Sequence, residues 1–105
     1  MVILETHAFT AGISELLSDD EYRLLQEALV ARPDAGRLIR GSGGLRKVRW
    51  AAKGRGKRGG VRVIYYWHVP GDRLLMLVAY AKSDQDDLTP RQRAMLRKIM
   101  ETEYP

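Results

Sequence analysis

The sequence of 105 residues contains no cysteine, which excludes a disulfide framework, a thiolate nucleophile and a zinc site with thiolate ligands. It also lacks an apolar run near the about 20 residues that a membrane-spanning helix requires. The first residues, "MVILETHAF", have no positively charged region before the apolar ones, unlike a secretory signal peptide. We therefore expect one cytoplasmic domain, residues 1–105, with no membrane partner, held together by apolar packing.

Acidic residues are absent from the middle of the chain. Between Ala35 and Gly71 there are ten Lys or Arg residues and no Asp or Glu, whereas the rest of the chain has eight basic and thirteen acidic residues. Such a segregated basic segment attracts polyanions, and nucleic acid is the leading candidate partner. An acidic protein segment is the second candidate. A membrane surface is less favoured, because the segment is rich in glycine and is not an amphipathic helix.

Periodicity, helix caps and turn residues predict four strands and three helices. The strands are expected at residues 2–5, 45–51, 61–69 and 73–81, and the helices at residues 6–17, 19–31 and from 90 onward. Ser18 with Glu21 forms a capping-box pattern before the second helix, and Thr89 with Gln92 forms one before the last. The order β-α-α-β-β-β-α predicts an α+β fold, with helices packed on a mainly antiparallel twisted sheet.

Residues 45–51, 61–69 and 73–81 are expected to form a three-stranded meander. Apolar residues of the helices and of its third strand, 73–81, are expected in the core. The nearly continuous apolar run at residues 73–81 predicts a central strand, joined to residues 61–69 by a hairpin turn at 70–72. The helix residues with this expected role are Leu24, Leu25, Ala28 and Leu29 in the second helix, and Met95, Leu96, Ile99 and Met100 in the last.

Strand alternation assigns the basic and aromatic residues to faces. Lys47 and Arg49 share one face of the strand at 45–51, and Arg46 lies on the other. On the next strand Arg62 and Tyr66 share a face, while Tyr65 and Trp67 point the other way, into the core. Tyr80 shares a face with Lys82 at the end of the strand at 73–81. For Tyr80, core packing and base stacking are equally favoured.

These residue types suit metal-free cleavage of RNA, which carries its own nucleophile in the 2′-hydroxyl. Arg62 and Arg49 are candidates to stabilise the charged phosphorane, because guanidinium groups stay charged and fork onto phosphate oxygens. Lys47 and Lys82 are candidates for proton transfer. No cofactor or metal is expected: the acidic run at residues 83–87 has irregular spacing and is interpreted as a solvated turn. His68 is interpreted as a strand-end residue outside the site.

The glycine-spaced segment "KGRGKRGG" is either a phosphate clamp or a solvated loop tip, and we favour phosphate contact. Tyr66 and Tyr80 are further candidates, because an aromatic ring can stack on a base. The predicted contacts to RNA or the ribosome are Arg46, Lys53, Arg55, Lys57, Arg58, Tyr66 and Tyr80.

The order of elements and two segments carry a resemblance to a known family. The segments are "GGLRKVRWAAKGRGKRGGVRVIYYW" and "VAYAKSDQDDLT", and they resemble the RelE/ParE superfamily of bacterial toxins, most closely its HigB-like RelE branch. The resemblance implies a RelE-like fold and a type II toxin that cleaves ribosome-bound messenger RNA and so inhibits translation. It implies a monomeric free toxin and a cognate antitoxin, such as a HigA-like protein with a helix-turn-helix domain.

The resemblance also implies functional positions. Lys47, Arg49 and Arg62 match basic residues on the first two meander strands, and Lys82 matches the first residue of a Lys-Arg pair, whose second position holds Ser83. Two alternatives remain open at this point. One is a ParE-like inhibitor of DNA gyrase on the same fold, and the other is a non-catalytic module that binds nucleic acid.

Overall fold

The computed structural model describes residues 1–52 and 60–103 of the chain. In chain order its elements are β1 (Val2–Glu5), α1 (His7–Leu16), α2 (Asp19–Ala31), β2 (Arg37–Leu38), β3 (Leu45–Trp50), β4 (Val61–His68), β5 (Arg73–Ala81) and α3 (Pro90–Glu103). The predicted α+β class and element order are confirmed. The addition is β2, a strand of 2 exposed residues that is too short to show alternation.

The strands form one 5-stranded sheet in the order β1-β5-β4-β3-β2. Strand β1 pairs parallel to β5, and the other neighbours pair antiparallel, so the sheet is mainly antiparallel as predicted. The β4–β5 hairpin closes at the expected turn, with His68 opposite Arg73. A bulge at Ile64/Tyr65 shifts the register between these two strands. The apolar strand β5 has a neighbour on each side, which confirms its predicted interior position.

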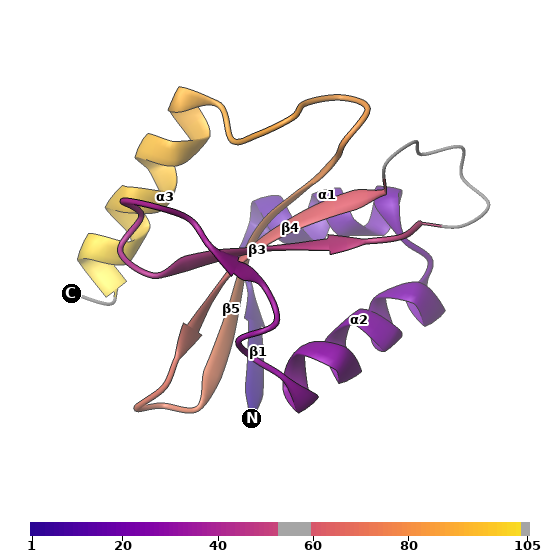
Figure 1. Ribbon diagram of the computed structural model, residues 1–105, viewed down its shortest axis with the longest axis horizontal. Helices are drawn as coiled ribbons and strands as arrows, with labels where there is room; N and C mark the ends of the chain where they lie inside the picture. The colour runs from indigo at the N-terminus through magenta and orange to yellow at the C-terminus, as the bar shows by residue number, and fades with distance from the viewer. Residues whose placement is uncertain (53–59, 104–105) are drawn as a thin grey trace.

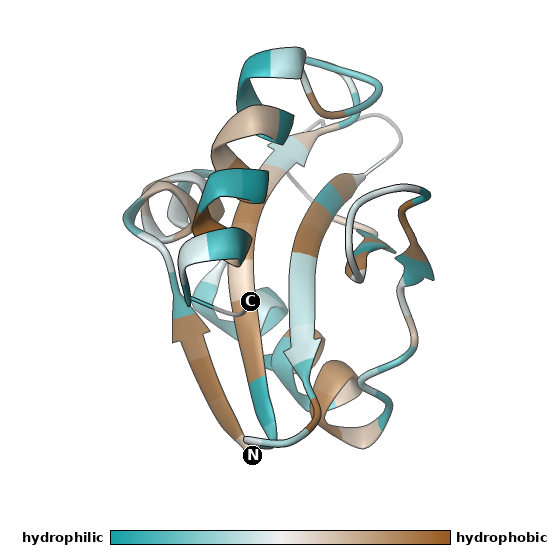
Figure 2. Ribbon diagram, turned by 90° about the vertical axis from the view of Figure 1, so that its left-hand side faces the viewer, coloured by the Kyte–Doolittle hydropathy of each residue, from teal (hydrophilic) through white to brown (hydrophobic). Residues whose placement is uncertain are grey.

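Helices cover both faces of this sheet. Figure 1 shows α1 and α2 on one side and α3 on the other. The first core packs Phe9 and Leu25 against Tyr65, and the second packs Leu96 of α3 against Ile64. In Figure 2 the brown, hydrophobic stretches run along the strands behind α3. Among the described residues, no helix is both long and apolar enough to span a membrane.

The predicted caps fix where the helices begin. Ser18 Oγ accepts a hydrogen bond from Glu21 N (3.1 Å), and Glu21 Oε1 accepts one from Ser18 N (2.8 Å). At α3, Thr89 Oγ1 accepts from Gln92 N (3.1 Å) and Gln92 Oε1 accepts from Thr89 N (3.0 Å). Each pair satisfies two backbone donors that no helical carbonyl can reach. The second capping box therefore sets the point at which the chain leaves the acidic turn and enters α3.

Two of the helix residues expected in the core are exposed, and those predictions were wrong. Leu24 is 53% exposed and Met95 is 42% exposed. In α2 the inward line is Leu25 and Leu29, four residues apart, and Leu24 lies about 100° around the helix from Leu25. The same offset separates Met95 from the buried Leu96. Each helix therefore buries a narrower stripe than its apolar residues suggested.

Tyr65 anchors the loop that leads from α2 to β2. Its side chain is fully buried, and its hydroxyl donates to Pro33 O (2.7 Å) and accepts from Gly36 N (2.8 Å). Gly36 lies so close that a Cβ there would stand 2.7 Å from the Tyr65 ring. Trp67 packs partly buried against the same core. The predicted core role of both aromatic residues is confirmed.

Candidate functional site

Basic residues gather at one end of the sheet, on the face that α3 covers. Arg49 of β3 lies opposite Arg62 of β4, and Arg62 lies opposite Tyr80 of β5. Directly opposed residues on one face have Cβ atoms about 4.5–5.5 Å apart, so these three side chains form a row across three strands. Lys47 shares the face of Arg49 two residues earlier on β3. Three of the four predicted catalytic residues are therefore neighbours.

Lys82 completes the group from the end of β5. Its backbone N–H donates to Gly60 O (3.1 Å), which holds it beside the start of β4. Its ammonium group forms an ion pair with Asp86, and both Lys82 and Arg62 act electrostatically on that carboxylate. These four residues, Lys47, Arg49, Arg62 and Lys82, form the basic cluster.

The members of the basic cluster differ in burial. Arg62 is only 5% exposed, whereas the side chains of Lys47 and Lys82 are 24% and 39% exposed and Arg49 is exposed. A charge that is shielded from water acts more strongly on nearby charges, because the effective dielectric constant around it is lower. The cluster thus has one deep guanidinium group and three cations nearer to solvent.

The acidic turn at residues 83–87 contacts the basic cluster. Asp87 Oδ1 lies 3.7 Å from Lys47 Nζ, and Asp87 Oδ2 lies 4.0 Å from the guanidinium of Arg93 on α3. The hydrogen bond and charge of Lys82 hold the pKa of Asp86 below its usual value, so this carboxylate stays ionised. Both aspartates are exposed, as expected of a solvated turn. Sequence reasoning nevertheless missed that they pair with the two candidate lysines.

Tyr80 is the buried end of the row. It is 5% exposed, and within residues 1–52 and 60–103 its hydroxyl has no hydrogen-bond partner. Burial raises the pKa of this hydroxyl, Asp87 raises it further, and Arg62 opposes the shift. The hydroxyl therefore keeps its proton at neutral pH and is a donor rather than a base. Of the two roles left open for Tyr80, its burial supports core packing over base stacking.

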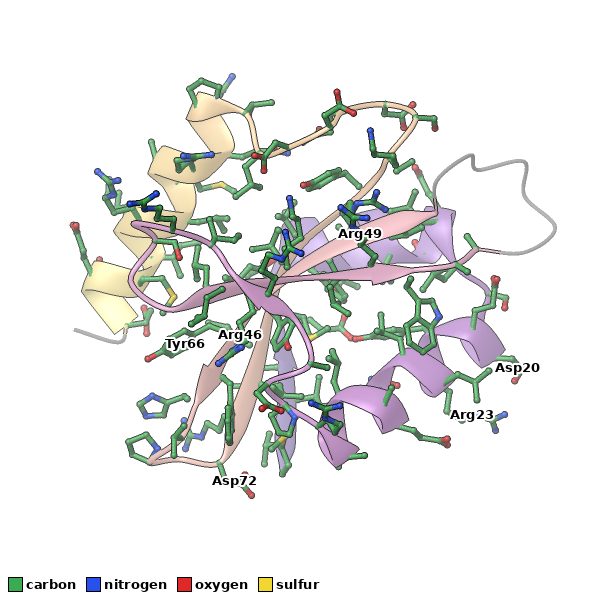
Figure 3. All side chains as sticks on the ribbon, in the orientation of Figure 1. Asp20, Arg23, Arg46, Arg49, Tyr66 and Asp72 are labelled. Atoms are coloured by element: carbon green, nitrogen blue, oxygen red, sulfur yellow. The ribbon has the colours of Figure 1, made fainter. Side chains whose placement is uncertain are left out.

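Other predicted contacts lie away from the basic cluster. Figure 3 shows Arg46 and Arg49 on opposite sides of the β3 ribbon. The guanidinium of Arg46 donates to Gly36 O (2.8 Å) and to Asp34 O (3.2 Å), so it braces the loop before β2.

Tyr66 lies on the same face as Arg62 but toward the opposite end of β4. It pairs with Leu45 and Leu75 and contacts the ring of His68 at 6.1 Å between centroids. It is therefore separated from Arg62 by four residues along β4, while its cross-strand partner Leu45 lies two residues before Lys47 on β3. Lys53, Arg55, Lys57 and Arg58 fall outside the described residues, so their predicted phosphate contacts stay predictions.

In the described part of the chain, the basic cluster and the acidic turn beside it do not form a preformed metal site. Among residues 1–52 and 60–103, no three His, Cys, Asp or Glu side chains come together as metal ligands. The closest acidic groups, Asp86 and Asp87, are each paired with a lysine. What the arrangement offers is a set of cations around one position, which suits the binding of a phosphate group.

The chain is similar to known bacterial toxins, both in sequence and in fold. A family model described as the RelE toxin of the RelE/RelB toxin-antitoxin system matches residues 17–104, a span that contains the whole basic cluster. Among solved structures, a double arginine-to-alanine variant of the E. coli toxin RelE in the free state is similar, with a TM-score of 0.53 and 15% sequence identity. The match covers 81% of this chain and 86% of that one. At this identity, the structural likeness shows a shared fold.

Proposed function

Because the chain belongs to the RelE toxin family, we propose that it is a ribosome-dependent endoribonuclease that cleaves messenger RNA and thereby inhibits translation. The observation that carries the proposal is the row of Arg49 and Arg62 with Lys47 beside it. Cleavage by the 2′-hydroxyl of RNA requires alignment, proton transfer and stabilisation of a crowded anionic phosphorane. A cluster of cations around one position supplies the last requirement directly.

The two arginines of the basic cluster are assigned different roles toward the phosphate. Arg62 is fixed in the sheet and nearly shielded from water, so its charge is already in place before the reaction and stabilises the transition state strongly. Arg49 is exposed and lies directly across from it. We assign to Arg49 the capture of the incoming phosphate, since its guanidinium fork is open to solvent.

Lys47 and Lys82 are assigned to proton transfer at the 2′-hydroxyl and at the 5′-oxygen of the leaving group. Each now contacts a carboxylate, Asp87 and Asp86 respectively. These carboxylates sit where an anionic substrate would contact the lysines. A bound phosphate therefore competes with both ion pairs, which are at the surface and individually weak.

Membership of a toxin family implies a cognate antitoxin. We propose a HigA-like antitoxin with a helix-turn-helix domain, on the basis of the resemblance to the HigB-like branch. The net charge of +5 favours association with an acidic surface. Co-purification with the product of the neighbouring gene tests this partner, and recovery of the toxin without it at stoichiometric expression would contradict it.

The function is tested on purified ribosomes programmed with messenger RNA. Primer extension should reveal new 5′ ends in the ribosome-bound message and none in the same RNA without ribosomes. Lys47→Ala should abolish these ends while the circular dichroism spectrum stays native. Intact message together with inhibition of DNA supercoiling by gyrase would instead support the ParE-like alternative and refute the proposal.

A further inference from the structure

A second group of cations lies beside the basic cluster, in a pocket between the β2–β3 turn and α3. Three arginines line it: Arg40 from the turn, and Arg93 and Arg97 from the helix. Buried Leu45 and Leu88 also line the pocket. Its volume is about 40 Å³, far below the roughly 300 Å³ or more of pockets for larger ligands. The pocket therefore suits a small anion better than a base.

The elements that carry these arginines are held in place. Ser42 Oγ accepts from Leu45 N (3.0 Å) and donates to Ile39 O (2.5 Å), which closes the turn that contains Arg40. Gly41 in this turn has a φ of +70°, a conformation that side-chain-bearing residues rarely adopt. Residues four apart on a helix share one face, so α3 presents Arg93 and Arg97 together.

The charge of the pocket is poorly neutralised. Within residues 1–52 and 60–103, Arg40 and Arg97 have no carboxylate at ion-pair distance, and Arg93 has Asp87 at 4.0 Å. Three guanidinium groups around a small space repel one another. An anion between them would relieve this repulsion and accept several charged hydrogen bonds, the arrangement in which arginine binds phosphate best.

Asp87 connects the pocket with the basic cluster. One of its carboxylate oxygens contacts Lys47 (3.7 Å), and the other contacts Arg93 (4.0 Å). The two cationic sites are thus separated by a single carboxylate. We propose that the Arg40–Arg93–Arg97 pocket binds a backbone phosphate of the substrate RNA strand, next to the phosphate that is cleaved. This inference rests on the proposed function and adds a binding subsite to it.

Binding is measured with a single-stranded 2′-O-methyl oligoribonucleotide, which cannot be cleaved because its 2′-oxygen carries no proton and is blocked. Fluorescence anisotropy over a range of salt concentrations gives the slope of log affinity against log salt. Each neutralised phosphate on a single strand contributes about 0.7 to this slope, so Arg40→Ala/Arg97→Ala, which removes the site for one phosphate, should make it shallower by about 0.7. The loss of affinity should be equal for oligonucleotides of different sequence.

A matched control separates the pocket from net charge. Arg91→Ala/Lys98→Ala removes the same number of charges from the protein, and both residues lie on α3 outside the pocket lining. The control should keep the native slope. Thermal unfolding checks that both double variants fold, and Arg40→Gln/Arg97→Gln replaces the alanine pair if the latter is unfolded.

Three results would overturn the inference. The first two are a native slope in the pocket variant and the same decrease of slope in both double variants. The third is a decrease of slope that is absent with the oligonucleotide and seen only when binding to ribosomes that carry no message is measured. The last result would assign the pocket to ribosomal RNA. The proposed function is judged separately, by cleavage of ribosome-bound message. If the message stays intact while the pocket variant alone loses slope, the pocket stands and the ribonuclease proposal falls.

Discussion

Replacement of Arg62 by methionine removes the deepest charge of the basic cluster with little change in side-chain volume. Arg62 is 5% exposed and lies between Arg49 and Tyr80 in the sheet. Methionine has a similar volume and needs no hydrogen-bond partner, but removal of one member of a buried polar interaction is destabilising. We therefore expect Arg62→Met to fold with a lowered unfolding midpoint, and its cleavage rate is compared per folded molecule.

We expect Arg62→Met to lower the rate of cleavage. Removal of one preorganised donor from a site that stabilises a developing anion lowers the rate about 10²–10³-fold, or about 2.7–4 kcal/mol. The shielded position of Arg62 places the expected loss toward the upper end of this range. Arg62→Lys keeps a charge but loses the guanidinium fork, so it should recover only part of the rate.

Single-turnover cleavage of ribosome-bound message measures this effect, and Arg73→Ala is the control on the same sheet. Arg73 is exposed and pairs with His68 at the opposite end of β5 from Tyr80. Its replacement removes one positive charge and leaves the basic cluster intact, so cleavage per folded molecule should stay native. A rate within threefold of native for Arg62→Met would refute the role assigned to Arg62.

Further predictions concern stability and protonation. Tyr65→Phe leaves two buried backbone groups without a partner and should lower the free energy of unfolding by about 1–3 kcal/mol in urea titrations; an unchanged midpoint would contradict this. Ser18→Ala removes half of a capping box and should cost about 1 kcal/mol in the same assay. The carboxyl of Asp86 should titrate below the ordinary aspartate pKa in NMR, and Lys82→Ala should raise that pKa toward the ordinary value. Since Lys82 favours the ionised form, the stabilisation from this pair is present above the ordinary aspartate pKa and is lost as pH falls through the depressed one.

The sequence was informative where a local rule governs the outcome. Alternation placed Lys47 and Arg49 on one face of β3, and it put Tyr65 on the opposite face of β4 from Arg62. The capping boxes located the starts of α2 and α3. These features depend on residues within a few positions of one another, so no knowledge of the tertiary arrangement was needed.

The features of the site that the sequence did not predict depend on contacts between distant segments. The pairing of Arg49 with Arg62 is a matter of register, which alternation alone does not fix. The acidic turn was interpreted as solvated, and its ion pairs with Lys47 and Lys82 were missed because residues 82–87 lie outside any helix, where no helical spacing relates side chains. The arginine pocket joins the β2–β3 turn to α3, segments more than forty residues apart, and no local pattern predicts it.

The central claim is that the 2′-hydroxyl of the message attacks the phosphate held at the basic cluster. The most direct test uses ribosomes programmed with a message that carries one 2′-deoxynucleotide immediately 5′ to the scissile phosphate. The account predicts that this message is not cut at that position and that the all-ribose message yields a 5′-hydroxyl on its downstream fragment. A cut that persists at the deoxynucleotide, or a downstream fragment with a 5′-phosphate, would contradict it.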